Sequence, residues 1–332
     1  MKQLLVPALA LLVQLAAACG SVEAGAGPGA DAPDGGDVDH RADGGAVDPD
    51  APTVLSVSPA DGTGGVAPDA HITVVFSQPM DADAVVAAWR SEDLPAGAVS
   101  FSWNETGDTL TVAPDDPLPV AEGSADNPDA IEPLTIAFVI GGEARDAAGV
   151  PLDEPLEVAF RTVRRLSLVL PYDASLSGSR IDTGSVDESP TTVYAGDSIG
   201  DKQIRLVVSF ALPAPLPGAI VESATFSATQ TDSSPGVYGA FGDLGLVHVR
   251  YATIATAYGT AALGRTNIFS TSGANGNRSA VVTGAVADDL EDEQPYAQFR
   301  LQFPVASNND GEYDIAQFTR AGLRLSISYL AE

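Results

Sequence analysis

The 332-residue sequence contains one cysteine, Cys19, so no disulfide bond within the chain can support its fold. Lysine occurs only at Lys2 and Lys202, and 16 basic residues stand against 45 acidic ones, which gives a formal net charge of −29. Nucleic acid is bound mainly by neutralising its phosphates, so this charge argues against a nucleic-acid partner. The arginines are scattered along the sequence, which therefore predicts no arginine-built anion site.

The residue patterns of common catalytic and metal sites are also missing. A nucleophilic triad needs a histidine base, and the three histidines, His40, His71 and His248, are far apart in the sequence. One cysteine and three scattered histidines give no zinc-binding spacing, and no glycine-rich phosphate loop separates a strand from a helix. His248 alternates with Leu246 and Arg250, which is typical of a structural side chain on one face of a strand. We therefore expect no catalytic residues and no enzyme activity.

No apolar run reaches the roughly 20 residues that a membrane-spanning helix needs. The longest, at 4–15, follows Lys2 and precedes three alanines and Cys19, which is the pattern of a secretory signal. The cysteine directly after these small residues resembles the lipobox of bacterial lipoproteins. The resemblance implies a lipoprotein signal peptide over 1–18, cleavage before Cys19 and lipidation of its thiol. A plain secretory signal that contains a cysteine by chance is the alternative.

Residues 19–51 are rich in glycine, aspartate and proline and hold almost no side chain that could build a core. Such a segment cannot offset its ordering entropy by burying apolar surface, so we expect a disordered acidic tether. A lipid-anchored protein uses a tether of this kind to hold its domains away from the bilayer. The predicted location is the cell envelope, and Gly20 after Cys19, rather than aspartate, is typical of sorting to the outer membrane.

Short strands are predicted over 52–163. Six segments alternate or run apolar over four to eight residues between turn residues, and none shows a helical period; they are TVLSVSP, AHITVVFS, GAVSFSWN, DTLTVAP, PLTIAFVI and PLEVAFRTV. This pattern indicates a β-sandwich in which Trp89 and Trp103 are core residues. Asp81 and Asp83 lie beside a turn, where capping hydrogen bonds are more common than a bound cation.

Residues 52–163 also resemble the bacterial Ig-like domain of S-layer and secreted multidomain proteins. The family pattern is Ser-Pro-x-Asp-Gly, a strand ending Phe-Ser-x-Pro-Met-Asp, and Asp-x-x-Gly before a last Phe-x-Thr strand. The matching positions are Ser58, Pro59, Asp61, Gly62, Phe76, Ser77, Pro79, Met80, Asp81, Asp146, Gly149, Phe160 and Thr162. The resemblance implies a spacer or adhesion module without catalytic residues.

Residues 164–332 are predicted to form a second, larger sandwich. KQIRLVVSFAL places Ile204, Leu206, Val208 and Phe210 on one face, and similar patterns recur in SATFSATQ, LGLVHVRYA, YAQFRLQFP and LRLSISYL. Only TGAVADDLED, at 283–292, is expected to form a helical turn or two. Eight to ten strands in this length suggest a two-sheet jelly roll.

Residues 164–332 also resemble the DNRLRE-type modules of bacterial surface proteins. The resemblance rests on the stretch from VYAGDSIGDKQIRLVVSFALP to ESATFSATQ, followed by VTGAVADDL, FRLQF and RLSISYL. These modules are similar to carbohydrate-binding jelly rolls. The resemblance implies a non-catalytic module, found beside enzymes or in cell-surface proteins.

Two features of this second region are candidate binding sites. SNNDGEYD places Asn308, Asp310, Glu312 and Asp314 at alternate positions, where their oxygens could converge on calcium; an ordinary polar turn is the alternative. All eight tyrosines lie in 164–332, and Tyr238 in the glycine-rich SPGVYGAFG is either a platform for a sugar ring or a residue at the edge of the core.

The sequence therefore predicts an all-β protein in which an Ig-like β-sandwich over 52–163 is followed by a larger jelly-roll β-sandwich over 164–332. The expected function is that of a non-catalytic, lipid-anchored cell-envelope protein that binds polysaccharide or another envelope component. Its expected partners are a membrane, reached through the lipid on Cys19, and that ligand. A structural spacer or assembly subunit without a specific ligand is the alternative. A polysaccharide-active enzyme is disfavoured by the missing histidine base. No cofactor is expected, apart from calcium.

Overall fold

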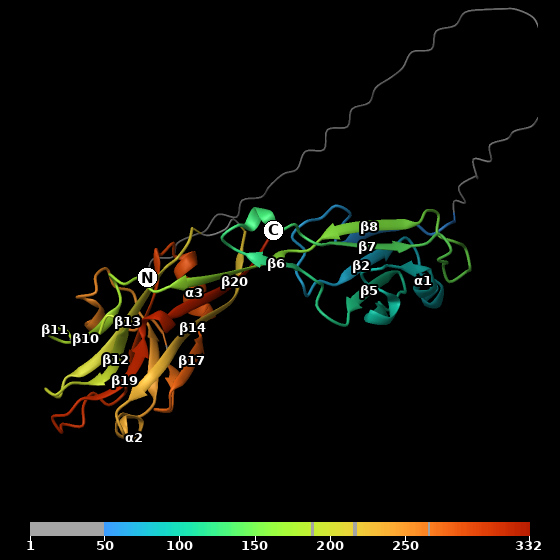
Figure 1. The fold of residues 1–332 in the computed structure, drawn as a ribbon. Coiled ribbons are helices and arrows are strands. Elements are labelled where there is room, and N and C mark those ends of the chain that lie inside the picture. Colours follow the sequence, from blue (N-terminus) through green and yellow to red (C-terminus); the bar gives the residue numbers. More distant parts are fainter. Residues whose placement is uncertain (1–49, 187–188, 215–217, 265) are drawn as a thin grey trace, which may run out of the picture. The chain divides into compact units, whose positions relative to one another are not determined.

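A computed structural model describes residues 50–186, 189–214, 218–264 and 266–332. Strands in sandwich-like sheets dominate these residues and helices are few, so the predicted all-β class is confirmed (Figure 1). The predicted signal peptide, Cys19 and nearly all of the predicted tether lie outside the described residues. No helix in the part of the chain that the structure describes is long and apolar enough to cross a membrane.

The first sandwich consists of two antiparallel sheets. The larger has the order β1 (Val54–Ser58), β2 (Ile72–Phe76), β5 (Thr109–Pro114) and β4 (Val99–Trp103). The smaller has the order β3 (Trp89–Arg90), β7 (Thr135–Ile140) and β8 (Leu156–Arg161). Alternate side chains of β2 and β7 are buried, as the period of two in the sequence predicts.

Helix α1 (Ala82–Ala88) differs from the sequence prediction, which expected no helix in this region. Seven residues are too few to show a helical period. The Asp81 side chain accepts hydrogen bonds from the backbone N–H groups of Asp83 and Ala84, and therefore caps the helix N-terminus. Asp81 thus has the capping role that the sequence favoured over a cation site.

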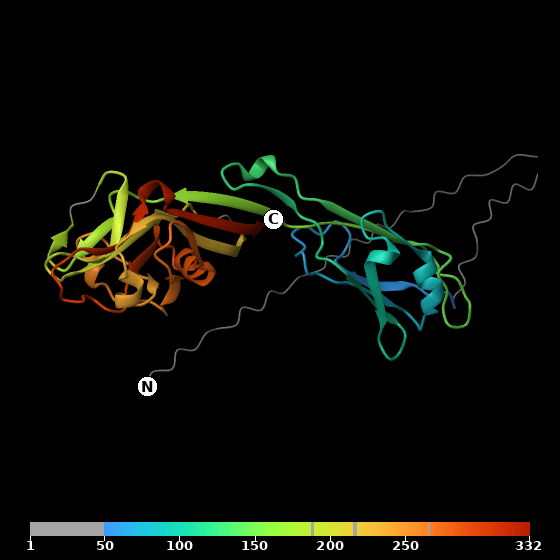
Figure 2. The same ribbon diagram turned by 60° about the horizontal axis from the view of Figure 1, so that its bottom comes forward.

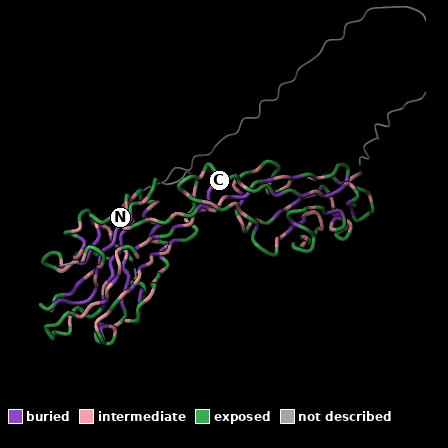
Figure 3. Tube along the Cα trace, in the orientation of Figure 1, coloured by how far each residue is buried: buried purple, intermediate pink, exposed green. Residues whose placement is uncertain are grey.

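Both tryptophans pack in the first core, as predicted. Trp89 is buried and stacks on Phe138 with ring centroids 4.8 Å apart, and its indole N–H donates to the Leu94 carbonyl. Trp103 is half-buried and stacks on Phe76 at 6.0 Å. Figure 3 shows that buried residues run along the strands of both sandwiches.

The second sandwich is larger and contains the other strands. One sheet consists of β12 (Thr192–Asp197), β19 (Asp314–Thr319), β14 (Ile220–Ser233), β20 (Arg324–Ala331) and β9 (Arg164–Pro171), with β17 (Gly276–Val281) paired to β14. The other consists of β16 (Asn267–Ser270), β15 (Leu244–His248), β18 (Tyr296–Gln302), β13 (Gln203–Ala211), β10 (Gly178–Ile181) and β11 (Gly184–Ser185). The ends of β12 and β13 pair with each other and join the two sheets.

Phenylalanines fill the space between these sheets. Phe226 of β14 lies with its ring centroid 5.8 Å from that of Phe210, 5.8 Å from Phe299 and 5.1 Å from Phe269. Helix α3 (Thr283–Glu291) contacts β14 and β18, so the predicted helical turns at 283–292 are confirmed (Figure 2). A short helix, α2 (Val237–Phe241), was not predicted.

A segment of the first predicted domain contributes a strand to this second sandwich. Strand β6 (Ala121–Ser124) pairs in parallel with β9, and Ala125 and Ile131 pack against the second core. A cut between 163 and 164 would therefore separate β9 from one of its partner strands. The division into domains at that position stays a prediction.

Candidate functional site

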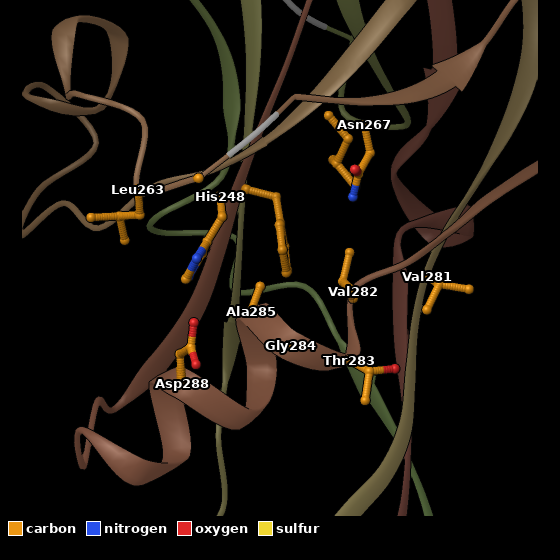
Figure 4. A pocket seen from close by; sticks show the side chains of 12 residues that line it. His248, Leu263, Asn267, Val281, Val282, Thr283, Gly284, Ala285 and Asp288 are labelled. Atoms are coloured by element: carbon orange, nitrogen blue, oxygen red, sulfur yellow. The ribbon is translucent and has the colours of Figure 1, made fainter.

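The candidate site is a cleft of about 370 Å³ between edge strands of the second sandwich, which we call the α3 cleft (Figure 4). Edge strand β16 and its neighbour β15 lie on one side, and edge strand β17 of the other sheet and the first turn of α3 lie on the other. The lining residues are Leu246, His248, Leu263, Gly264, Asn267, Val281, Val282, Thr283, Gly284, Ala285, Asp288 and Phe299.

The floor of the cleft is apolar because it reaches the core. Leu246 and Phe299 are buried and face the space between the sheets. At the mouth, Leu263 and Val281 are 51% and 71% exposed, which is unusual for large apolar side chains. An apolar floor with apolar residues at its mouth favours a partly apolar ligand.

The polar side of the cleft rests on a buried carboxylate. Asp289 of α3 is fully buried; its Oδ2 lies 2.9 Å from His248 Nε2, and its Oδ1 accepts a 2.7 Å hydrogen bond from Arg250 Nε. Arg250 also donates to Asp292 at 2.7 Å. Burial lowers the pKa of Arg250, but the bonds to Asp289 and Asp292 outweigh it and raise the pKa overall. These contacts fix α3 to β15 and so hold the cleft open.

A polar cavity of about 250 Å³ adjoins the cleft and shares His248, Leu263 and Asp288 with it. Figure 4 shows His248 of β15 and Asp288 of α3 facing each other across the cleft, with Asn267 on β16, the neighbour of β15. The Thr283 hydroxyl already accepts a hydrogen bond from the Ala224 backbone N–H. Among the described residues, Asp289 is the one hydrogen-bond partner of the His248 ring, so no hydroxyl is bonded to this imidazole as a nucleophile would be.

Three of the calcium candidates, Asn308, Asp310 and Glu312, lie in the exposed turn before β19, and the fourth, Asp314, is the half-buried first residue of that strand. The Asn308 amide donates to Asp310 at 2.7 Å and to Asp314 at 2.8 Å, and the Asp310 carboxylate accepts from the Glu312 backbone N–H. The structure thus brings Asn308, Asp310 and Asp314 together, while Glu312 contributes only its backbone. Within the described ranges, no three acidic, histidine or cysteine side chains form a group that could hold a metal ion. Calcium binding stays a prediction.

Sequence reasoning missed two aspartates that join this turn, one at the end of β12 and one in the loop after it. Asp201 accepts a hydrogen bond from the Gly311 N–H, and Asp197 accepts one from the Asp314 N–H. Asp197 is fully buried, and its Oδ2 has no hydrogen-bond partner. Burial raises the pKa of Asp197, and the charges of Asp314 and Asp310 add to this effect. No sequence signal pairs positions more than 100 residues apart.

Asp197→Asn is expected to stabilise the second sandwich by roughly 1–3 kcal/mol at neutral pH in the presence of a chelator, because it removes an uncompensated buried charge. The folded pKa lies above the unfolded value, so ionisation opposes folding, and this penalty grows as the pH rises through the folded pKa. The advantage of the variant should therefore shrink in acid. Thermal melts of both proteins at several pH values check this.

The same thermal melts also test calcium binding at this turn. If calcium binds at this turn, it should raise the melting temperature of the wild type, and Asp310→Ala should abolish the rise. A shift that survives Asp310→Ala would place the ion elsewhere, and equal melting in calcium and chelator would contradict the calcium prediction.

Tyr238 lies in α2 at the edge of the second core. Its ring packs edge-on against Phe303 at 5.2 Å, and its hydroxyl donates to Gln230 Oε1 at 2.8 Å. Burial raises the pKa of the Tyr238 hydroxyl. These contacts occupy part of the ring and the hydroxyl, and the predicted role in ligand binding stays a prediction. Cys19, the predicted lipidation site, lies outside the described residues.

Similarity to solved structures is weak. The chain is 16% identical to an L,D-transpeptidase from Mycobacterium smegmatis, covering 70% of this chain and 77% of that one, with a TM-score of 0.24. It is 17% identical to the surface layer protein SbsC; the match covers 70% of this chain and 32% of that one, with a TM-score of 0.22. It is 13% identical to an Escherichia coli alpha-2-macroglobulin fragment; the match covers 82% of this chain and 72% of that one, with a TM-score of 0.27. No curated protein matches the chain.

One family model matches part of the chain. Residues 48–123 match the model of a bacterial Ig-like domain, which bears out the predicted resemblance over that range. Strands β7 and β8, beyond the matched range, complete the sandwich. An Ig-like domain is therefore present in this part of the chain, with the family match extending over 48–123.

Proposed function

We propose that this protein is a non-catalytic, lipid-anchored component of the bacterial cell envelope whose second sandwich binds polysaccharide or another envelope component. The observation that carries the binding role is the α3 cleft, which combines an apolar floor with a few polar groups at its mouth. The Ig-like domain supports the assignment to a non-catalytic surface module. The lipobox-like segment ending at Cys19 supports the anchor.

The chemistry of the cleft suits a sugar, which has an apolar ring face and a hydroxyl edge. Leu263 and Val281 offer exposed apolar surface at the mouth, above the buried Phe299 and Leu246 of the floor. Asn267 and Asp288 are exposed at the mouth and have hydrogen-bonding atoms for hydroxyl groups. Because the His248 ring is held by Asp289, it is a rigid part of the wall.

Gly284→Leu is expected to abolish binding in the cleft by filling it. A Cβ atom at Gly284 meets no atom within 4 Å, so the added side chain enters open space without distorting the backbone. Leucine also favours a helix over glycine by up to about 1 kcal/mol, so the variant should remain folded. Binding of the wild type and the variant to an array of bacterial surface glycans, followed by titration with the best ligand, is the measurement.

Gly97→Leu is the matched control. Gly97 lies in a short helical turn of the first sandwich, and its Cβ position is also open. This variant should bind as the wild type does. If the wild type binds no glycan, or if Gly284→Leu binds as well as the control, the polysaccharide part of the proposal is wrong.

Cys19→Ser tests the anchor. The thiol is the only possible acceptor for a diacylglycerol thioether in a chain with one cysteine, so the variant should lose labelling by palmitate analogues. It should also move from the membrane fraction to the soluble fraction, because the acyl chains provide the membrane affinity. Equal membrane partition of the variant and the wild type would refute the anchor.

A further inference from the structure

Three arginines that are scattered in the sequence lie together on one face of a sheet. Arg180 of β10 is directly opposite Arg205 of β13 in the antiparallel register. Arg300 of β18 is opposite Val207, two residues from Arg205 and therefore on the same face. The α3 cleft uses residues of the other face of this sheet, such as Phe299.

Two of these guanidinium groups donate hydrogen bonds to the same backbone carbonyl oxygen. Arg205 donates to the Tyr258 carbonyl at 2.6 Å, and Arg300 donates to the same oxygen at 3.0 Å. Arg300 also donates to the Thr260 carbonyl at 2.7 Å, and the Arg205 guanidinium lies 4.3 Å from the centre of the Tyr258 ring. Both side chains are thus fixed in place by the segment 257–260, which makes the cluster rigid.

The three arginines lack an anionic partner. In the described part of the chain no carboxylate lies within ion-pair distance of Arg180, Arg205 or Arg300; the nearby Asp182 pairs with Lys202 instead. Arg180 has no hydrogen-bond acceptor at all among the described residues, and its Nε is buried. Arg300 is 5% exposed, and its Nε is also buried without a partner.

Such an arrangement is costly without a ligand. Like charges directly opposite each other in a sheet are destabilising, and a buried charge without a partner costs more still. Burial lowers the pKa of Arg300, and the charge of Arg205 lowers it further. The chain has a net charge of −29, so carboxylates are abundant, yet none of those in the described residues lies within ion-pair distance of these arginines.

We propose that Arg180, Arg205 and Arg300 form a binding site for an oxyanion, the carboxylate, sulfate or phosphate group of an acidic polysaccharide. Arginine suits this ligand because its planar guanidinium donates two parallel hydrogen bonds to such groups. Arg180 has no hydrogen-bond acceptor among the described residues, so its terminal nitrogens are the donors that reach the ligand, while Arg205 and Arg300 supply a fixed positive field. The net negative charge of the chain repels polyanions at a distance, so binding depends on this local contact.

The test compares Arg180→Gln with Arg161→Gln in the purified protein. Arg161 is exposed on β8 of the first sandwich, so the two variants change net charge equally. The probes are oligogalacturonate, a sulfated dextran oligomer and inorganic phosphate, with neutral dextran as a blank, and binding is measured by calorimetry at low ionic strength. We expect at least one anionic probe to bind, Arg180→Gln to weaken it tenfold or more, and Arg161→Gln to leave it unchanged.

The probe that binds identifies the carboxylate, sulfate or phosphate as the recognised group. Absence of binding to all three, or equal weakening by both variants, would overturn the proposal.

Melting in an anion-poor buffer gives a second measurement. Arg180→Gln should melt at the same temperature as the wild type or higher, because it relieves repulsion by Arg205 and breaks no hydrogen bond. A lower melting temperature would reveal a partner for Arg180 inside the protein and would also overturn the site. Gly284→Leu should not affect this binding, so the outcome is independent of the α3 cleft.

Discussion

Asp289→Ala is expected to destabilise the second sandwich by about 3 kcal/mol. Removal of one member of a buried charged pair leaves its partner without compensation, which costs about 3–5 kcal/mol. The lower end of this range applies because Arg250 keeps its bond to Asp292 and is 28% exposed. In a domain of this size the loss lowers the melting temperature by roughly 6–12 °C.

The same variant should weaken any ligand of the α3 cleft, because Asp289 fixes α3 against His248 and Arg250 of the neighbouring chain segment. Asp292→Ala is the control, since the Asp292 side chain is 57% exposed and its pair with Arg250 is worth less than about 1 kcal/mol. Equal losses in the two variants would show that burial of Asp289 does not set the strength of the network. Chemical denaturation of both variants, followed by circular dichroism, makes the comparison.

Phe226→Ala is expected to cost about 3–5 kcal/mol, the range for removal of a buried aromatic side chain. Phe226 is fully buried and contacts the rings of Phe210, Phe269 and Phe299, which come from three other strands. Strands that belong to both sheets meet at this ring, so the cavity cannot close by the movement of one of them. Thr225→Ala, at the adjacent position facing the other side of β14, should cost less than about 1 kcal/mol.

The distribution of aromatic residues allows each core to be followed separately. Both tryptophans belong to the first sandwich and all eight tyrosines lie in 164–332, so tryptophan fluorescence and tyrosine absorbance report on different cores. Phe226→Ala should shift the tyrosine transition and leave the tryptophan transition unchanged. A shift of both by the same amount would mean that the chain unfolds as one unit, which would contradict the predicted domains 52–163 and 164–332.

Local patterning in the sequence was sufficient to predict the strands and much of the core. All six strand segments predicted in 52–163 contain observed strands, and Leu206, Val208 and Phe210 are buried in the second core as their alternation indicates. Strand alternation is a property of neighbouring residues, so it can be read without knowledge of which strands pair. The helical segment at 283–292 was visible for the same reason, whereas α1 and α2 were too short to show a period.

The candidate sites were decided by tertiary structure. His248 and Asp289 are 41 residues apart, Asp197 and Asp314 are 117 apart, and the three arginines come from three strands. Their proximity depends on strand order and register, which a single sequence does not encode in any local pattern. Composition therefore established an acidic protein with one cysteine, and local patterning established its all-β class. Only the pairing of distant strands created a buried carboxylate beside a cleft and a cluster of arginines without an anionic partner among the described residues.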